Sequence, residues 1–226
     1  MWPFPRQHPD EIVRRYQANT PRRLPRNTPL AGLRLLSVDL ETTGFRVGTD
    51  LVLSIAAVDF TADEIKVSGI SNWMVRHAHT PVNEATAIHG ILPSESGKGE
   101  PEAGVLSQLL PLLEGSVLVG HHVSFDAAML DDALRRTFGI RLRNPLVDTA
   151  RLAMSTIDAF HQTGYSNQRP PTLDEVCAKA GVALIDRHTA VGDAFTTAQL
   201  FLFLCAKLKH MLGRELIVDD IPYQSS

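Results

Sequence analysis

Apolar residues in this 226-residue chain change their spacing after about residue 75. Three apolar runs joined by short polar links come first, and such runs are typical of β-strands in an antiparallel meander. They cover residues 33–40, 51–60 and 65–75. Farther along, apolar residues recur every three or four positions, which is typical of helices that cover one face of a sheet.

Helical and strand-like segments alternate in the rest of the chain. Helices are predicted at 83–90, 102–115, 124–138, 172–181 and 190–212, with a short strand at 116–121 and another that runs into a helix within 145–154. A meander followed by this alternation predicts an α/β fold with a mixed five-stranded sheet, antiparallel strands first and parallel strands after, flanked by helices.

The first 30 residues differ in composition from the rest. They are rich in proline and contain six arginines against two acidic residues, Asp10 and Glu11. We predict a Pro/Arg-rich N-terminal extension over 1–30, one domain over 31–212 and a short C-terminal tail over 213–226. The extension is interpreted as a surface arm, with contact to nucleic acid as the alternative.

Charge and cysteine content narrow the classes of protein. A net charge of −3 gives no global basic surface, so a nucleic-acid partner would have to be held by a local binding site rather than by the overall charge. Cys177 and Cys205 each lie alone in an apolar helical segment, which predicts buried thiols in a reducing compartment. The N-terminus lacks the apolar core of a signal peptide and no apolar run is judged long enough to span a membrane, so we expect a cytoplasmic protein without a membrane partner.

Two acidic residues at the end of the first strand pose an electrostatic problem. Asp39 and Glu41 are two positions apart, so both point to the same face, where carboxylates repel each other and lose hydration. Asp126 and Asp193 lie in the first turns of predicted helices, where the helix dipole would explain either one alone. Together, four oxygen ligands without a Cys/His cluster fit Mg²⁺ or Mn²⁺ better than structural Zn²⁺.

The segments around these acids resemble the three motifs of a known family, the DEDDh 3′–5′ exonucleases. This is the superfamily of the bacterial polymerase III epsilon proofreading subunit, and it has the ribonuclease H-like fold. The resemblance runs from about Leu33 to Leu204. The three motif matches are "DLETTG" (39–44), "VGHHVSFDAAML" (119–130) and "HTAVGDA" (188–194), with supporting matches at "ATAIHGI" (85–91) and "NPLVDTARLA" (144–153).

The resemblance implies catalysis with two divalent cations, Mg²⁺ or Mn²⁺. Asp39 would bind both ions. Glu41 and Asp193 would complete the shell of the first ion, and Asp126 would contact the second. His188, five positions before Asp193, would be the general base, a role that suits imidazole because its charge changes near neutral pH.

The resemblance also implies a pocket for the terminal nucleotide. Its expected lining is Thr42, Thr43, Phe45, Glu84, Ala85, Ile88 and His89. Phe45 could stack on any base, although ordinary core packing would explain Phe45 and Ile88 equally well. The chain has His121 and His122 where the family more often has His-Asn, which puts one supporting contact in doubt.

We therefore predict a metal-dependent 3′–5′ exonuclease that hydrolyses phosphodiester bonds and releases nucleoside monophosphates. The favoured partner is single-stranded DNA rather than RNA, within a polymerase or repair assembly or alone. The alternatives are an RNA-directed exoribonuclease and a non-catalytic nucleic-acid-binding module on the same fold. The sequence leaves open the sugar preference, proofreading against stand-alone repair or RNA trimming, the oligomeric state and the resident metal.

Overall fold

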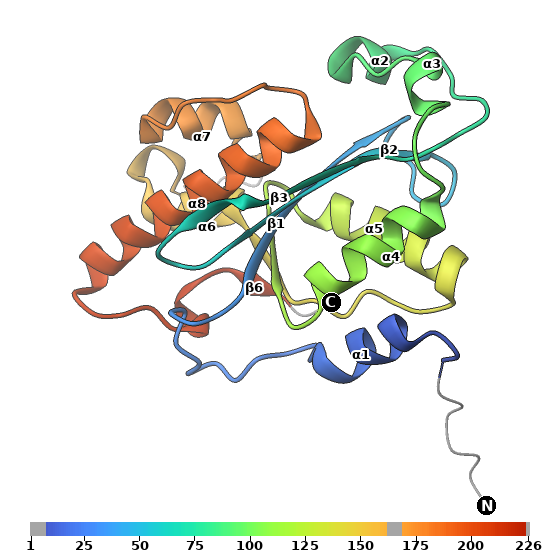
Figure 1. Ribbon diagram of the computed structural model, residues 1–226. Helices are drawn as coiled ribbons and strands as arrows, with labels where there is room; N and C mark the ends of the chain where they lie inside the picture. Colours follow the sequence, from blue (N-terminus) through green and yellow to red (C-terminus); the bar gives the residue numbers. More distant parts are fainter. Residues whose placement is uncertain (1–7, 162–168, 225–226) are drawn as a thin grey trace, which may run out of the picture.

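The structure, a computed structural model, describes residues 8–161 and 169–224. Figure 1 shows a central twisted sheet with helices on both faces. The strands are β1 (Leu35–Thr42), β2 (Val52–Phe60), β3 (Ile65–Met74), β4 (Val117–Gly120), β5 (Leu146–Asp148) and β6 (Tyr223–Gln224), in the spatial order β3-β2-β1-β4-β5-β6. β1, β2 and β3 are antiparallel, β4 and β5 run parallel to β1, and β6 is antiparallel to β5. The predicted mixed sheet is confirmed, with a sixth strand that the prediction of five omits.

Two layers of helices enclose the sheet (Figure 1). The helices on one side are α4 (Glu102–Leu113) and α5 (Ser124–Phe138), with α1 (Glu11–Asn19) packed on α4. Those on the other side are α6 (Thr149–Thr156), α7 (Leu173–Ala180) and α8 (Ala190–Leu212). The short helices α2 (Glu84–His89) and α3 (Pro93–Ser96) lie beyond the carboxyl end of β1, and single 3₁₀ turns cover Asp158–Phe160 and Val218–Asp220.

Alternation along β1 decides which layer each of its side chains faces. Leu36 and Leu40 belong to the hydrophobic cluster beneath α4 and α5, whereas Leu35 belongs to the cluster beneath α8. Since successive side chains of a strand point to opposite faces, Asp39 and Glu41 share the face of Leu35 and lie on the side of α8. The sequence pattern therefore directs both acids toward the start of that helix.

The helix α8 is apolar because it packs on the sheet. By length and composition it would pass as a membrane span, contrary to the prediction that no apolar run is long enough. However, 61% of its most apolar window is buried within the domain. Phe201 and Leu204 lie in one cluster with Leu35 and Val58 of the sheet, so core packing accounts for the apolar sequence.

Residues 8–30, part of the predicted extension, pack along the domain. Tyr16 of α1 is fully buried, and its hydroxyl donates to Asn144 Oδ1 at 2.8 Å. The same hydroxyl accepts from the Arg143 N–H at 2.7 Å. A buried hydroxyl with two partners fixes α1 against the loop that leads into β5.

The C-terminal tail lies against the same N-terminal segment. The Leu30 N–H donates to the Leu216 carbonyl at 2.8 Å, and the Leu24 N–H donates to the Tyr223 hydroxyl at 2.6 Å. The tail then adds β6 to the edge of β5. Both ends of the described chain thus complete the sheet and its covering layer.

Candidate active site

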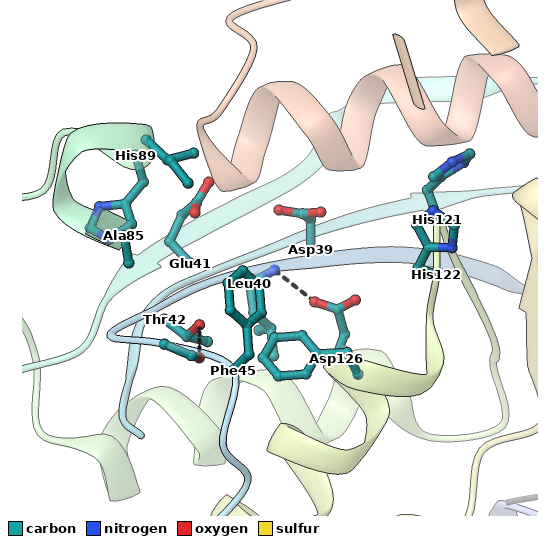
Figure 2. A pocket seen from close by; sticks show the side chains of 13 residues that line it. Asp39, Leu40, Glu41, Thr42, Phe45, Ala85, His89, His121, His122 and Asp126 are labelled. Carbon is teal, nitrogen blue, oxygen red and sulfur yellow. Dashed lines mark hydrogen bonds between the residues drawn. The ribbon is translucent and has the colours of Figure 1, made fainter. Parts of the chain in front are cut away.

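Carboxylates from separate elements meet at the carboxyl end of β1. Asp39 and Glu41 come from β1 and Asp193 from the first turn of α8, and one oxygen of each lies within 4.8 Å of the others. Asp126, in the first turn of α5, approaches from the opposite side of the strand (Figure 2). The structure thus brings together all four acids that the sequence selects.

The place of Asp126 follows from the length of the β1–β4 ladder. Among the described residues, β4 pairs with β1 only from Leu35 to Ser37. Farther along β1, the Leu40 N–H donates to Asp126 Oδ1 at 3.2 Å, as Figure 2 shows. The carboxylate therefore satisfies a backbone donor beyond the end of the ladder, which holds it beside Asp39.

Burial and mutual repulsion make the four carboxylates unfavourable in their charged forms. Burial is the main cause that raises the pKa of Asp39 well above its ordinary value, and the neighbouring carboxylates raise it further. Burial raises the pKa of Glu41 to about 8 and that of Asp126 to about 7. Burial also raises the pKa of Asp193. The cluster therefore holds excess negative charge that protons or cations would offset.

An unpaired oxygen supports the same conclusion. Asp193 Oδ1 is buried and has no hydrogen-bond partner within the described part of the chain. Buried polar atoms normally have a partner, so this oxygen is available to a ligand. Carboxylate oxygens are the ligands that Mg²⁺ and Mn²⁺ prefer, and the cluster fits a divalent cation of this kind.

Arg187 supplies a positive charge at the cluster. Its guanidinium pairs with Asp193, and its Nε lies 2.7 Å from Oδ1 of Asp174 on α7. This charge lowers the pKa values of both β1 carboxylates and so opposes the effect of burial. Neither Arg187 nor Asp174 follows from the motif spacing. The only signal in the sequence is that Arg187 directly precedes His188.

His188 lies in the loop before α8, outside the wall of the cavity beside the acids. It is exposed, its φ is +67°, and it is close enough to Asp193 to lower the pKa of that carboxyl. A Cβ at Gly192 would collide with the carbonyl oxygens of Ile185 and Asp186. The loop can approach α8 this closely only because residue 192 is glycine.

A cavity of about 410 Å³ opens beside the acids (Figure 2). Its acidic part is formed by Asp39, Glu41 and Asp126. The predicted substrate residues in its wall are Thr42, Phe45, Ala85, Ile88 and His89. Thr43 and Glu84 lie outside this wall. The Thr43 hydroxyl accepts from the Leu51 N–H at 2.9 Å, and Glu84 is exposed in the first turn of α2, so their contact with substrate stays a prediction.

Two phenylalanine rings form an apolar part of the cavity wall. The Phe45 side chain is 76% exposed, and its ring centroid lies 5.6 Å from that of Phe125 on α5. An exposed aromatic face in a cavity wall is a surface on which a flat ring can stack. Phe125 was outside the predicted lining, although it directly precedes Asp126 in the second motif.

The histidines that follow β4 also belong to the wall. His121 Nε2 donates to the Pro171 carbonyl and its Nδ1 lies beside the Thr149 hydroxyl, both at 2.9 Å. Burial lowers the pKa of His121 to about 4, so this ring is neutral at physiological pH. The His122 N–H donates to Asp148 Oδ1 at 3.1 Å, which joins the ends of β4 and β5. His121 thus acts as a structural link, and neither ring nitrogen is open to a ligand.

The helix α2 is tied directly to the strand that carries the acids. Asn83 Nδ2 donates to the Thr43 carbonyl at 2.8 Å. His89, at the end of α2, accepts from the Ile91 N–H at 3.0 Å, and its buried Nε2 has no partner among the described residues. Burial lowers the pKa of His89. The ring therefore lines the cavity on a helix that Asn83 ties to the end of β1.

Comparison with known proteins agrees with this geometry. The model of a protein family described as Exonuclease (RNase_T) matches residues 36–201. The chain belongs to this exonuclease family. The family lies in the DEDD exonuclease superfamily, so the resemblance and the enzyme class expected from the motifs are confirmed.

Relatives of this exonuclease domain are longer proteins whose names refer to DNA polymerase III. The chain is 32% identical over 188 residues to a DNA polymerase III subunit epsilon-like protein of Rhodobacter capsulatus, which aligns 80% of this chain and 25% of the relative. It is 30% identical over 186 residues to a PolC-type DNA polymerase III of Clostridium perfringens, and this alignment covers 81% of this chain and 12% of that relative. The chain thus spans a quarter of the first relative's length and less of the second's.

Solved structures of Exonuclease I from E. coli share the fold. The complex with a dT13 oligonucleotide has a TM-score of 0.65 at 18% identity and covers 80% of this chain and 43% of that chain. A zinc-bound complex of Exonuclease I with single-stranded DNA has a TM-score of 0.61, also at 18% identity, and covers 79% of this chain and 41% of that chain. The predicted ribonuclease H-like fold is confirmed.

Proposed function

We propose that the protein is a 3′–5′ exonuclease that releases nucleoside monophosphates from single-stranded DNA ends. The observation that carries the proposal is the meeting of Asp39, Glu41 and Asp193, with Asp126 behind them, beside an open cavity that has an acidic and an apolar part. Family membership supports phosphodiester hydrolysis as the reaction. Exonuclease I, which shares the fold, is found with bound oligodeoxynucleotides, and this supports DNA as the substrate.

The cofactors are proposed to be two divalent cations, Mg²⁺ or Mn²⁺. Asp39 would be their shared ligand, Glu41 and Asp193 would complete one shell, and Asp126 would belong to the other. When bound, such cations stabilise negative charge on the scissile phosphate and promote ionisation of the attacking water. The raised pKa values of the cluster support this assignment, because a cation would favour the charged carboxylates.

The chain's own residues would position the strand and move the proton. Phe45 and Ile88 offer apolar surface to the terminal base, and stacking on an aromatic ring tolerates any base. His188, exposed next to Asp193, would accept the proton of the attacking water as general base. The relatives' names also support a polymerase assembly as the setting.

The proposal is tested with 3′-labelled single-stranded DNA, duplex DNA and RNA of one sequence, each with Mg²⁺ or Mn²⁺. We expect mononucleotide release, fastest from single-stranded DNA, and its loss in Asp39→Asn. Asp63→Asn, at an exposed acid outside the cluster, is the matched control and should keep full activity. Faster release from RNA would overturn the DNA assignment. No release from any substrate by the wild-type protein would overturn the catalytic one.

A further inference from the structure

One guanidinium, that of Arg187, lies at the cluster formed by Asp39, Glu41 and Asp193 at the carboxyl end of β1. Arg187 pairs with Asp193, whose other oxygen is the buried atom without a partner in the described chain. Its charge also acts on Asp39 and Glu41. The guanidinium therefore occupies one oxygen of a ligand that a divalent cation would need.

A second carboxylate holds the same guanidinium from the other side. Arg187 Nε lies 2.7 Å from Asp174 Oδ1, and its second nitrogen lies 3.3 Å from Asp174 Oδ2. This two-point contact uses the planar fork of arginine, a geometry that lysine lacks. Asp174 belongs to α7 and lies outside the carboxylate cluster. It can keep Arg187 in place when the contact with Asp193 is broken.

The backbone on both sides of Arg187 is also fixed. Asp186 and His188 have φ values of +40° and +67°, and the Ile185 N–H donates to Thr196 Oγ1 at 3.2 Å. The loop rests on Gly192, where any side chain would collide with it. Arg187 is thus a built part of the site, and its side chain is only 27% exposed.

We infer that Arg187 is the internal counter-ion of the carboxylate cluster, competes with a divalent cation for Asp193, and is retained by Asp174 when the cation binds. The inference rests on the proposed function. It explains how a domain can fold with these acids clustered before any cation is present. It also implies a moderate affinity for the cation, because cation binding must first break the ion pair between Arg187 and Asp193.

The test compares the wild-type chain of 226 residues with its Arg187→Gln variant. Mn²⁺ affinity is measured by calorimetry, and thermal unfolding is measured with EDTA and with Mn²⁺, at about pH 8.5 so that protons compete less for the cluster. We expect Arg187→Gln to bind Mn²⁺ at least about tenfold more tightly, since a positive charge beside the site is removed. We also expect it to melt at a lower temperature in EDTA, with a larger gain on adding Mn²⁺.

Control variants separate this role from simpler ones. Arg187→Lys keeps the charge, so its Mn²⁺ affinity should stay closer to wild type. Arg169→Gln removes an exposed arginine that pairs with Glu175 on the same helix α7, and it should change no Mn²⁺ affinity. Equal losses of melting temperature with and without Mn²⁺, at unchanged Mn²⁺ affinity, would show a merely structural arginine and overturn the inference.

The retaining role of Asp174 is tested by a double-mutant cycle. In the wild-type background, Asp174→Asn should weaken Mn²⁺ binding severalfold, because the displaced guanidinium would lose its remaining partner. In the Arg187→Gln background it should have no effect. Equal effects in both backgrounds would overturn the retaining role. A wild-type protein that binds no Mn²⁺ would instead refute the proposed function itself, so the two failures are distinguishable.

Discussion

Replacing Asp39 by asparagine should stabilise the metal-free protein although it abolishes activity. The oxygens of Asp39, Glu41 and Asp193 lie within 4.8 Å of one another. At that separation and an effective dielectric constant of about 20, two full charges repel by about 3.5 kcal/mol. Bound protons and the charge of Arg187 remove much of this cost. We therefore expect a net gain of about 2 kcal/mol in the free energy of unfolding, or about 4–8 °C in Tm.

The size of the gain should depend on pH in a definite direction. The pKa of Glu41 rises from an ordinary 4.5 to about 8 in the folded protein. Between these values the folded protein keeps a proton that the unfolded chain loses, so the metal-free wild type becomes less stable as pH rises from about 4.5 to about 8. The pKa of Asp126, raised from 3.8 to about 7, acts in the same direction. Asp39→Asn should relieve more repulsion at high pH, where more of the cluster is charged.

Thermal and urea unfolding in EDTA at about pH 5.5 and about pH 8.5 would measure both effects. Asp63→Asn serves again as the control, since it removes an exposed acid without relieving the cluster. Adding Mn²⁺ should then reverse the order, because the wild type gains stability from the cation and the variant lacks the shared ligand. If Asp39→Asn melted no higher than wild type in EDTA, or gained equally at both pH values, the electrostatic account of the site would be wrong.

Four other changes have definite expected outcomes. Excess Mn²⁺ should raise the Tm of the wild type by several degrees, while Asp193→Asn should show little response by differential scanning fluorimetry. His188→Ala should lower kcat by about 10²–10⁴ in the mononucleotide-release assay and keep its Mn²⁺ affinity by calorimetry, and near-normal turnover would refute its role as base. Gly192→Ala should lower the free energy of unfolding by about 1–3 kcal/mol in urea titrations because its Cβ meets backbone carbonyls, so an unchanged midpoint would mean the loop can move aside. Tyr16→Phe should lower the free energy of unfolding by about 1–3 kcal/mol because buried polar groups lose their partner, and a urea midpoint equal to wild type would contradict the packing of α1.

The carboxylate cluster could be predicted because two patterns in the sequence, the alternation of side chains along a strand and the order of the motifs, select the same acidic residues. A period of two places Asp39 and Glu41 on one face, and the motifs identify Asp126 and Asp193 as their distant partners. The meander, the parallel strands and the long helix at 190–212 follow from apolar spacing in the same way. The roles of the four acidic residues toward cations and substrate are predictions from the family resemblance, and the experiments above test them.

Features that depend on contacts between distant segments could not be predicted. β6 has only two residues, too few for a periodic pattern, and the tail joins the sheet only because β5 is already in place. The pairing of Arg187 with Asp174 joins a loop to another helix, and no spacing rule relates the two. The lining of the cavity was predicted only in part. Phe125 and His121 were not in the predicted lining, and they reach the cavity through the turn of the chain after β4.

The packing of α1 and the tail limits how the exonuclease domain can be cut from its chain. The family match covers residues 36–201, yet α1 buries Tyr16 against α4 and the tail pairs with β5 outside that range. A fragment trimmed to the match would expose apolar surface on α4 and leave the backbone groups of β5 open to strands of other molecules. Such edges promote aggregation, so poor solubility of the trimmed fragment would reflect its boundaries and not an unstable fold.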